Sequence, residues 1–375
     1  MSLQKYLEKM KTIQDNILEF LDNEEDPESN FENLRQIFDE QKIFDDQQEF
    51  QSLMHLILKI ANNYFRKSGF FDKICKILLL CKETMKKYLS NSEIYQIFKD
   101  NNRILLILIE EKIMEFDDNI VKQLPSSTML YFLPEMQPFK YNKWFRRDNL
   151  RITNKFLLIY KKQEEEEIPE NLYEDRKTGE NNSYICKLIQ NDLIDEFITY
   201  VNRNNYPIQS NIPSSFYDTN SFINECKITL IEYAAFFGSI QIFNYLRMNG
   251  ANLNSFIWPY AIHGQNAELI QLLKENNIEP YDKTYNECFI KSVIFFQKDI
   301  ANYFMDNYLD NFINKIKNMF QNNNIEQILE SYNFDFIEKK DINKNTFPIL
   351  CQNKYSKIVE ILMKDKNFDV NAFQI

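Results

Sequence analysis

The scarcity of glycine constrains the fold of this chain more than any other feature of its sequence. Only 5 of the 375 residues are glycine, so few positions can adopt a positive φ angle without strain. Folds rich in β-strands depend on tight turns that need such residues. The sequence therefore predicts an all-α protein of helices joined by short polar loops. The same scarcity leaves no glycine-rich loop of the kind that cradles phosphate groups.

Composition and charge narrow the class of protein further. Hydrophobic residues make up 44% of the chain and aromatic residues 15%, enough apolar surface for a continuous core and too much for a disordered chain. The formal net charge of −11 argues against nucleic acid or an anionic membrane as a partner for the bulk of the molecule. The longest apolar run is too short to cross a bilayer, so we expect no transmembrane segment.

The first half of the chain has the apolar spacing of amphipathic helices. Apolar residues recur every three or four positions from Leu3 to Leu21, and the pattern resumes several times before Pro125, Pro134 and Pro138 interrupt it. We therefore expect a helical N-terminal region over residues 1–165. Four consecutive glutamates at 164–167, followed by Pro169, predict an acidic linker over residues 166–182.

A helix-pair pattern stands out in the second half, between Thr229 and Asn254. A double alanine, Ala234-Ala235, allows a short helix to approach its neighbours, and Gly238 suits the left-handed conformation that ends such a helix. A longer apolar helical stretch follows and ends at Gly250 in the same way. Weaker copies of the pattern cover residues 188–200, 260–277, 292–304 and 350–371.

This pattern resembles the ankyrin repeat, with matches at Thr229, Ala234, Ala235, Gly238, Gly250, Ala251 and Asn254. Leu230 and Glu232 replace the proline and histidine of the family motif, which we expect to weaken the turn that opens the first helix. The whole chain is similar to ankyrin-repeat proteins of AT-rich protozoan parasites that carry an uncharacterised helical N-terminal region. The segments that carry this likeness are 183–186, 196–201, 229–246, 260–264 and 299–303.

The resemblance implies an ankyrin-type α-solenoid, with a degenerate repeat array over residues 183–375. Gly238 and Gly264 are 26 residues apart, against a usual period of about 33 residues, so the hairpin fingers between repeats should be reduced. The family binds proteins on a concave surface, and the resemblance carries no established biochemical activity. It implies a non-catalytic scaffold or interaction module, located in the cytoplasm, with a protein partner of unknown identity.

Two groups of residues are candidates for binding. The first consists of inner-helix positions that face the concave groove in ankyrin proteins: Phe236, Phe237, Ile262, His263, Val293, Ile294, Gln352 and Asn353. The alternative is that these side chains pack against the neighbouring repeat. The second is a basic stretch over 140–162, interleaved with aromatic residues, which includes Lys140, Lys143, Arg146, Arg147 and Arg151. It could bind RNA or an anionic membrane, or form one face of a solvated amphipathic helix.

Residues suited to catalysis or metal binding are few. The chain has two histidines, His55 and His263, and six cysteines without a CxxC pair. We therefore expect no cofactor and no metal site, buried free thiols, and a partly buried role for His55 in its helix. A non-catalytic role is the main hypothesis. An enzyme or regulatory subunit with an unrecognised site in the N-terminal region stays open as an alternative.

Overall fold

The computed structural model describes residues 1–139, 170–224, 227–308, 324–339, 342 and 346–365. Regular structure in these ranges is helical throughout, and the strand-type pairing found there is an isolated antiparallel bridge between Asn211 and Thr229. The all-α class expected from the glycine content and the apolar spacing is therefore confirmed.

The chain forms two compact units, each built from separate stretches of sequence. Unit 1 combines Met1–Phe70 with Leu188–Asn211 and Ile228–Ile375, and unit 2 combines Phe71–Lys187 with Ile212–Lys227. This grouping differs from the linear division expected from the sequence, because residues 1–70 belong to the same unit as the C-terminal helix pairs.

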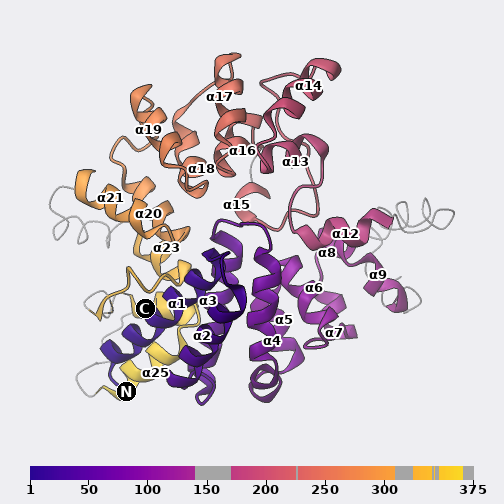
Figure 1. Ribbon diagram of the computed structural model, residues 1–375. Coiled ribbons are helices and arrows are strands. Elements are labelled where there is room, and N and C mark those ends of the chain that lie inside the picture. Colours follow the sequence, from indigo (N-terminus) through magenta and orange to yellow (C-terminus); the bar gives the residue numbers. More distant parts are fainter. Residues whose placement is uncertain (140–169, 225–226, 309–323, 340–341, 343–345, 366–375) are drawn as a thin grey trace. The chain divides into compact units, whose positions relative to one another are not determined.

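Unit 1 begins with three long helices, α1 (Leu3–Asp22), α2 (Pro27–Glu40) and α3 (Gln47–Asn63). Shorter helices follow, in chain order α13 (Tyr184–Gln190, which starts in unit 2), α14 (Ile194–Asn204), α16 (Leu230–Phe236), α17 (Ile240–Met248), η2 (Ser255–Ile257), α18 (Trp258–His263), α19 (Ala267–Glu275), α20 (Asn286–Ile294), α21 (Lys298–Tyr308), α23 (Asn324–Ser331), α24 (Phe347–Gln352) and α25 (Ser356–Lys364). They form successive pairs, and the first helices of neighbouring pairs pack together, as α16 does with α18 and α18 with α20 (Figure 1).

The start of α16 has a complete capping box. The Thr229 side chain accepts a hydrogen bond from the Glu232 backbone, and the Glu232 carboxylate accepts one from the Thr229 N–H at 2.9 Å. This arrangement satisfies two backbone donors that a helix start otherwise leaves unpaired. The expectation that Glu232 weakens the opening turn is therefore wrong, because its carboxylate replaces the missing motif residues as a cap.

The turn inside each pair contains one residue in the left-handed conformation. Gly238 has φ +66°, as expected, and Gly250, after the second helix, has φ +87°. The residues equivalent to Gly238 in the other pairs are not glycine: they are Asp192, Gln265, Phe296 and Lys354. Gly264 itself has ordinary helical angles, and the left-handed residue of its turn is the next one, Gln265. Four of these five turns therefore accept a strained backbone at a side-chain-bearing residue.

Hydrogen bonds join the turn of one pair to the turn of the next. The Ser239 hydroxyl donates to the Ile189 carbonyl at 2.5 Å, and the Asn266 amide donates to the Gly238 carbonyl at 3.1 Å. The backbones approach so closely that a Cβ atom at Gly238 would lie 2.5 Å from the Gly264 carbonyl oxygen. These contacts fix the register of the stacked pairs.

The helices α1 and α3 of unit 1 pack against its C-terminal helices, although more than 260 residues separate them in sequence. Helix α25 contacts both α3 and α1 (Figure 1), and Lys357 of α25 pairs with Asp46, the N-cap residue of α3, at 2.6 Å. The last helix of unit 1 therefore packs directly against the chain's own N-terminal helices.

Unit 2 consists of α4 (Phe70–Tyr88), α5 (Asn91–Phe98), α6 (Asn102–Glu110), α7 (Asp118–Gln123), α8 (Ser126–Tyr131), α9 (Leu133–Met136), η1 (Gln137–Phe139), α12 (Glu170–Thr178) and α15 (Ser221–Asn224). Helix α12 lies where the sequence predicts an acidic linker, and this part of the prediction is wrong. Arg176 of α12 is buried and forms two hydrogen bonds with the Glu135 carboxylate, at 2.8 and 2.9 Å. Arg103 also donates to the Lys177 carbonyl at 2.6 Å, so these tertiary partners hold the segment in place.

Candidate partner-binding surfaces

The eight inner-helix candidates lie at the C-terminal ends of first helices or at their C-caps, one to three residues before the left-handed residue of each turn. The two residues chosen in α18 and α20 are one position earlier, relative to that residue, than those in α16 and α24. Four are buried, namely Phe236, Ile262, His263 and Val293. Phe237, Ile294 and Asn353 are half-buried, and Gln352 is exposed. For the four buried side chains the geometry supports packing against neighbouring helices, the alternative to groove contact.

His263 occupies the centre of an aromatic cluster. Its ring stacks on Phe236 with the centroids 3.6 Å apart, and meets Phe295 edge-on at 5.0 Å. Phe65, just beyond the end of α3, lies 5.9 Å away. The imidazole Nδ1 donates to the Phe236 carbonyl at 3.0 Å. An N-terminal segment of unit 1 thus helps to cover a position at which we had expected partner contact.

Burial determines the protonation of both histidines. It lowers the pKa of His263 to about 3, and the nearby Arg66 acts in the same direction. Burial also lowers the pKa of His55, which is half-buried in α3, to about 4, with contributions from Lys354 and Lys59. Both rings are therefore neutral at neutral pH, where they act as packed side chains and not as acid–base groups.

The loops that precede α18 and α20 carry an exposed aromatic pair, which we call the finger pair. Phe256 is 58% exposed and Tyr281 is 69% exposed, and their rings stack with centroids 5.0 Å apart. Met248, at the end of α17, is 79% exposed. Exposed aromatic side chains that already hold one another in place are suited to anchoring a partner at low entropic cost. Sequence reasoning missed this pair because it treated the fingers as reduced, polar connections.

A groove of about 680 Å³ lies between α19 and α21. Ile270, Ile300 and Tyr303 contribute to its lining. Lys274 donates a hydrogen bond to the Tyr303 hydroxyl. Burial raises the pKa of the Tyr303 phenol, but the hydrogen bonds with Lys274 and Tyr308 and the charge of Lys274 together outweigh burial and lower the pKa. Gln265, Gln271, Glu275 and Asp299 also line the groove, which therefore combines a few apolar side chains with several polar and charged ones.

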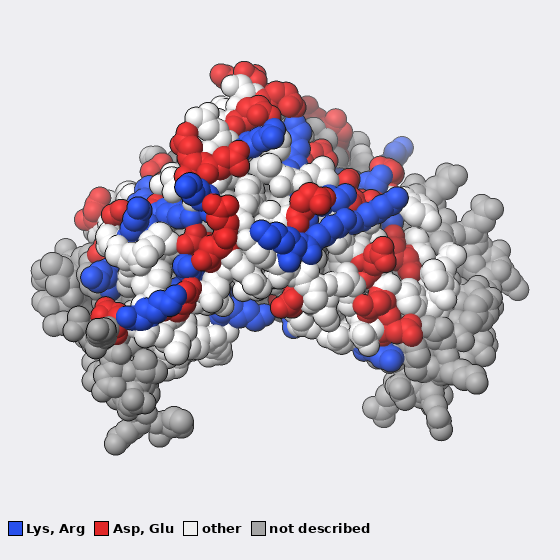
Figure 2. Space-filling view, turned by 90° about the horizontal axis from the view of Figure 1, so that it is seen from below, with Lys and Arg blue, Asp and Glu red and all other residues white. Residues whose placement is uncertain are grey.

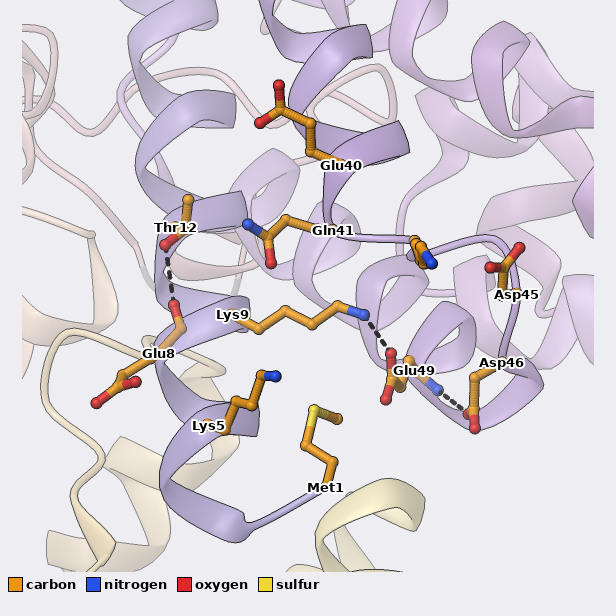
Figure 3. Close-up of a pocket in the computed structure, with 11 residues that line it drawn as sticks. Met1, Lys5, Glu8, Lys9, Thr12, Glu40, Gln41, Asp45, Asp46 and Glu49 are labelled. Carbon is orange, nitrogen blue, oxygen red and sulfur yellow. Dashed lines mark hydrogen bonds and ion pairs between the residues drawn. The ribbon is translucent and has the colours of Figure 1, made fainter.

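A second pocket of about 640 Å³ lies between α1 and the turn that joins α2 to α3 (Figure 3). Lys9 of α1 reaches across to Glu49 of α3 at 2.5 Å. Charged side chains of both signs line it, among them Lys5, Glu8 and Asp45. This mixture favours neither an anion nor a cation as a ligand.

The basic stretch with Lys140, Lys143, Arg146, Arg147 and Arg151 lies outside the described residues. Over the face drawn in Figure 2, lysine and arginine side chains alternate with aspartate and glutamate. That face therefore gives no support for binding a polyanion.

Groups suited to metal binding or to thiol chemistry are also sparse. Within the described ranges, no three His, Cys, Asp or Glu side chains come together as metal ligands. Cys81 and Cys288 are buried free thiols, as expected, and Cys186 is also buried, whereas Cys75 is half-buried and Cys351 is exposed. Cys226 lies outside the described residues. Burial raises the pKa of the Cys81 and Cys288 thiols, which makes both poor nucleophiles.

Comparison with known proteins found no family model, no curated protein and no solved structure that matches this chain. Among the described residues, none of the helices has the length and apolar character needed to cross a membrane.

Proposed function

We propose that this protein is a non-catalytic interaction module made of ankyrin-type helix pairs, and that it binds a protein partner through the finger pair. The single observation that carries this proposal is the stacked, exposed contact between Phe256 and Tyr281. Two aromatic side chains leave a large apolar area in water, and each can bury some 150–250 Å² against a partner.

The packing of the surrounding helices supports this assignment of the surface. Trp258 and Tyr285, which lie close to the finger pair in sequence, pack edge to face 5.5 Å apart, and Trp258 is fully buried. The indole N–H donates to the Ile278 carbonyl at 2.9 Å, which anchors the two loops to one another. A surface built on such anchored loops meets a partner with little reorganisation.

The ankyrin-type assignment draws on the repeated turns. Pairs with a left-handed residue at equivalent positions, a capped first helix at Thr229 and turn-to-turn hydrogen bonds fit the sequence pattern between Thr229 and Asn254. We place the partner-binding surface at the finger pair and not at the inner-helix ends. Four of the inner-helix candidates are buried, namely Phe236, Ile262, His263 and Val293.

The test is affinity capture with the full-length protein and a Phe256→Ala/Tyr281→Ala variant, with thermal unfolding of both. Tyr184→Ala is the matched control, because Tyr184 is 56% exposed and lies in unit 2, away from the fingers in sequence. We expect a partner that the wild-type and control proteins capture and that the double variant, equally stable, does not. Capture of the same partner by all three proteins would contradict the assignment of the finger pair.

A further inference from the structure

The groove between α19 and α21 carries two opposite charges that are not neutralised by salt bridges. Lys274, in the last turn of α19, and Asp299, in the first turn of α21, both line the groove and are both exposed. Within the described ranges neither side chain forms a salt bridge. Lys298, next to Asp299 in sequence, pairs instead with Asp335 at 2.9 Å. An ammonium group and a carboxylate are therefore both available to a ligand in this groove.

Two tyrosines hold the Lys274 ammonium group at its end of the groove. It donates to the Tyr303 hydroxyl, and the Tyr308 hydroxyl lies 3.5 Å from that of Tyr303. The ammonium group also lies 5.1 and 5.6 Å from the centres of the two rings, where π electrons attract a cation. The hydrogen bonds with the tyrosines raise the pKa of Lys274, so it is charged at neutral pH. An ammonium group has three donors, and at least one remains for an anion.

The middle of the groove is apolar. Ile270 lies one helical turn before Lys274, and Ile300 lies between Asp299 and Tyr303 in sequence; both line the groove. Ile270 is buried and Ile300 is half-buried. The lining therefore offers a carboxylate, two apolar side chains and an ammonium group to the same ligand.

Neither a simple anion nor a simple cation matches this lining. Glu275 also lines the groove, although its carboxylate accepts a hydrogen bond from the Gln271 amide at 2.7 Å. An anion would meet Glu275 and Asp299, and a cation would meet Lys274, so each would be repelled by part of the lining. A zwitterion with an apolar body is complementary to both charges and to the isoleucines.

The spacing of the two charges sets the length of that zwitterion. Asp299 and Tyr303 are four residues apart on α21, which corresponds to a rise of about 6 Å along the helix axis. The two charges of an α-amino acid are much closer together than this. Six single bonds in an extended chain span about 7 Å, and six bonds separate the ammonium nitrogen of a lysine side chain from its carboxyl carbon.

We propose that the groove between α19 and α21 binds a lysine at the carboxyl end of a partner peptide. Asp299 binds the ε-ammonium group, Ile270 and Ile300 contact the methylene groups, and Lys274 with Tyr303 binds the terminal carboxylate. The volume of about 680 Å³ lies in the range of small-ligand sites and has room for the residue that precedes the lysine. This site involves different residues from the finger pair and does not depend on it.

The first test is ligand-observed NMR on the full-length protein with three probes. Nα-acetyl-lysine keeps both charges, its amide lacks the carboxylate, and Nα,Nε-diacetyl-lysine lacks the ammonium group. We expect saturable binding of Nα-acetyl-lysine, with the other two probes binding about tenfold more weakly or less, because each loses one charge-assisted contact. No saturable binding of Nα-acetyl-lysine, or equal binding of all three probes, would overturn the proposal.

The second test assigns each charge of the probe to its residue. Lys274→Met should abolish the preference for the free carboxylate over the amide, and Asp299→Asn should abolish the preference for the free ε-ammonium group. Glu268→Gln is the matched control, because Glu268 is an exposed acid in the first turn of α19 that does not line the groove. All three side chains are exposed, and thermal unfolding checks that the variants are folded.

The control should bind all three probes as the wild type does. If both preferences persist in Lys274→Met and Asp299→Asn, the probe binds elsewhere and the proposal is wrong. If Glu268→Gln weakens binding as much as Asp299→Asn, binding reflects the overall charge of the surface, which also excludes the site.

Discussion

Acidification should lower the free energy of unfolding of unit 1, because the unfolded chain takes up a proton on His263 that the folded chain does not. This change falls at pH values where few other groups titrate. The ring lies between Phe236 and Phe295, and its Nε2 atom is buried with no hydrogen-bond partner in the described structure. A proton on Nε2 would therefore place a charge in apolar surroundings, near Arg66. In the unfolded chain the same ring takes up a proton in water, with a pKa of about 6.5.

The size of the effect follows from the two pKa values. Because folding lowers the pKa of His263 to about 3, its contribution to stability is complete above pH 6.5 and is lost as the pH falls. Between pH 7.5 and pH 5.5 the loss is about 1.4 kcal/mol. His55, with a pKa of about 4 in the folded chain, adds at most the same amount, so the two histidines together account for about 3 kcal/mol.

Urea unfolding at the two pH values, in the wild type and in His263→Phe, measures this loss. Phenylalanine keeps the stacking on Phe236 but cannot take up a proton, so the variant should lose about half as much stability on acidification as the wild type. At pH 7.5 the variant should be less stable than the wild type by about 1–3 kcal/mol, because the Phe236 carbonyl loses its donor. An equal pH-dependent loss in both proteins would refute the reasoning.

Three further predictions concern the backbone and unit 2. Gly238→Ala should destabilise the protein by more than about 2 kcal/mol, because the new Cβ would lie 2.5 Å from a backbone oxygen at a residue with positive φ. Gly69→Ala is the control: Gly69 has φ +72° but open space around it, so the change should cost only about 1–2 kcal/mol. Lys354→Gly, at φ +59°, should raise the free energy of unfolding by about 0.5–1 kcal/mol. Arg176→Met should destabilise unit 2 by about 3–5 kcal/mol, because it leaves the Glu135 carboxylate without its bidentate partner. Chemical denaturation checks all three, and a neutral outcome for Gly238→Ala or Arg176→Met would contradict the contacts described.

The candidate binding surface was only partly open to prediction. The inner-helix candidates do lie near the ends of first helices, but Phe236 stands two residues before its left-handed turn residue, whereas Ile262 and Val293 stand three before theirs. Their burial was not predictable from these positions, because it depends on side chains from elsewhere, such as Phe65 against His263. The signal for the finger pair in the sequence was an aromatic residue, Phe256 or Tyr281, in each of the connections before α18 and α20.

The sequence by itself determined the helical class and the helix–turn–helix pattern of the pairs. The low glycine content, the helical spacing of apolar residues and the pattern from Thr229 to Gly250 all act on local structure. Each depends on residues close together in the sequence, so its effect can be predicted without knowing the tertiary structure. Even the left-handed turns at Gly238 and Gly250 follow from residue type.

Only the tertiary structure decided what packs against the C-terminal part of unit 1 and which segments are ordered. Gln14 meets Asn333 across more than 300 residues, and α12 is held by Glu135 where charge alone predicted a linker. The left-handed turns at Phe296 and Lys354 are likewise imposed on residues that avoid this conformation. Such outcomes depend on the sum of many distant contacts, whose free energy outweighs local preference and leaves no periodic signal in the sequence.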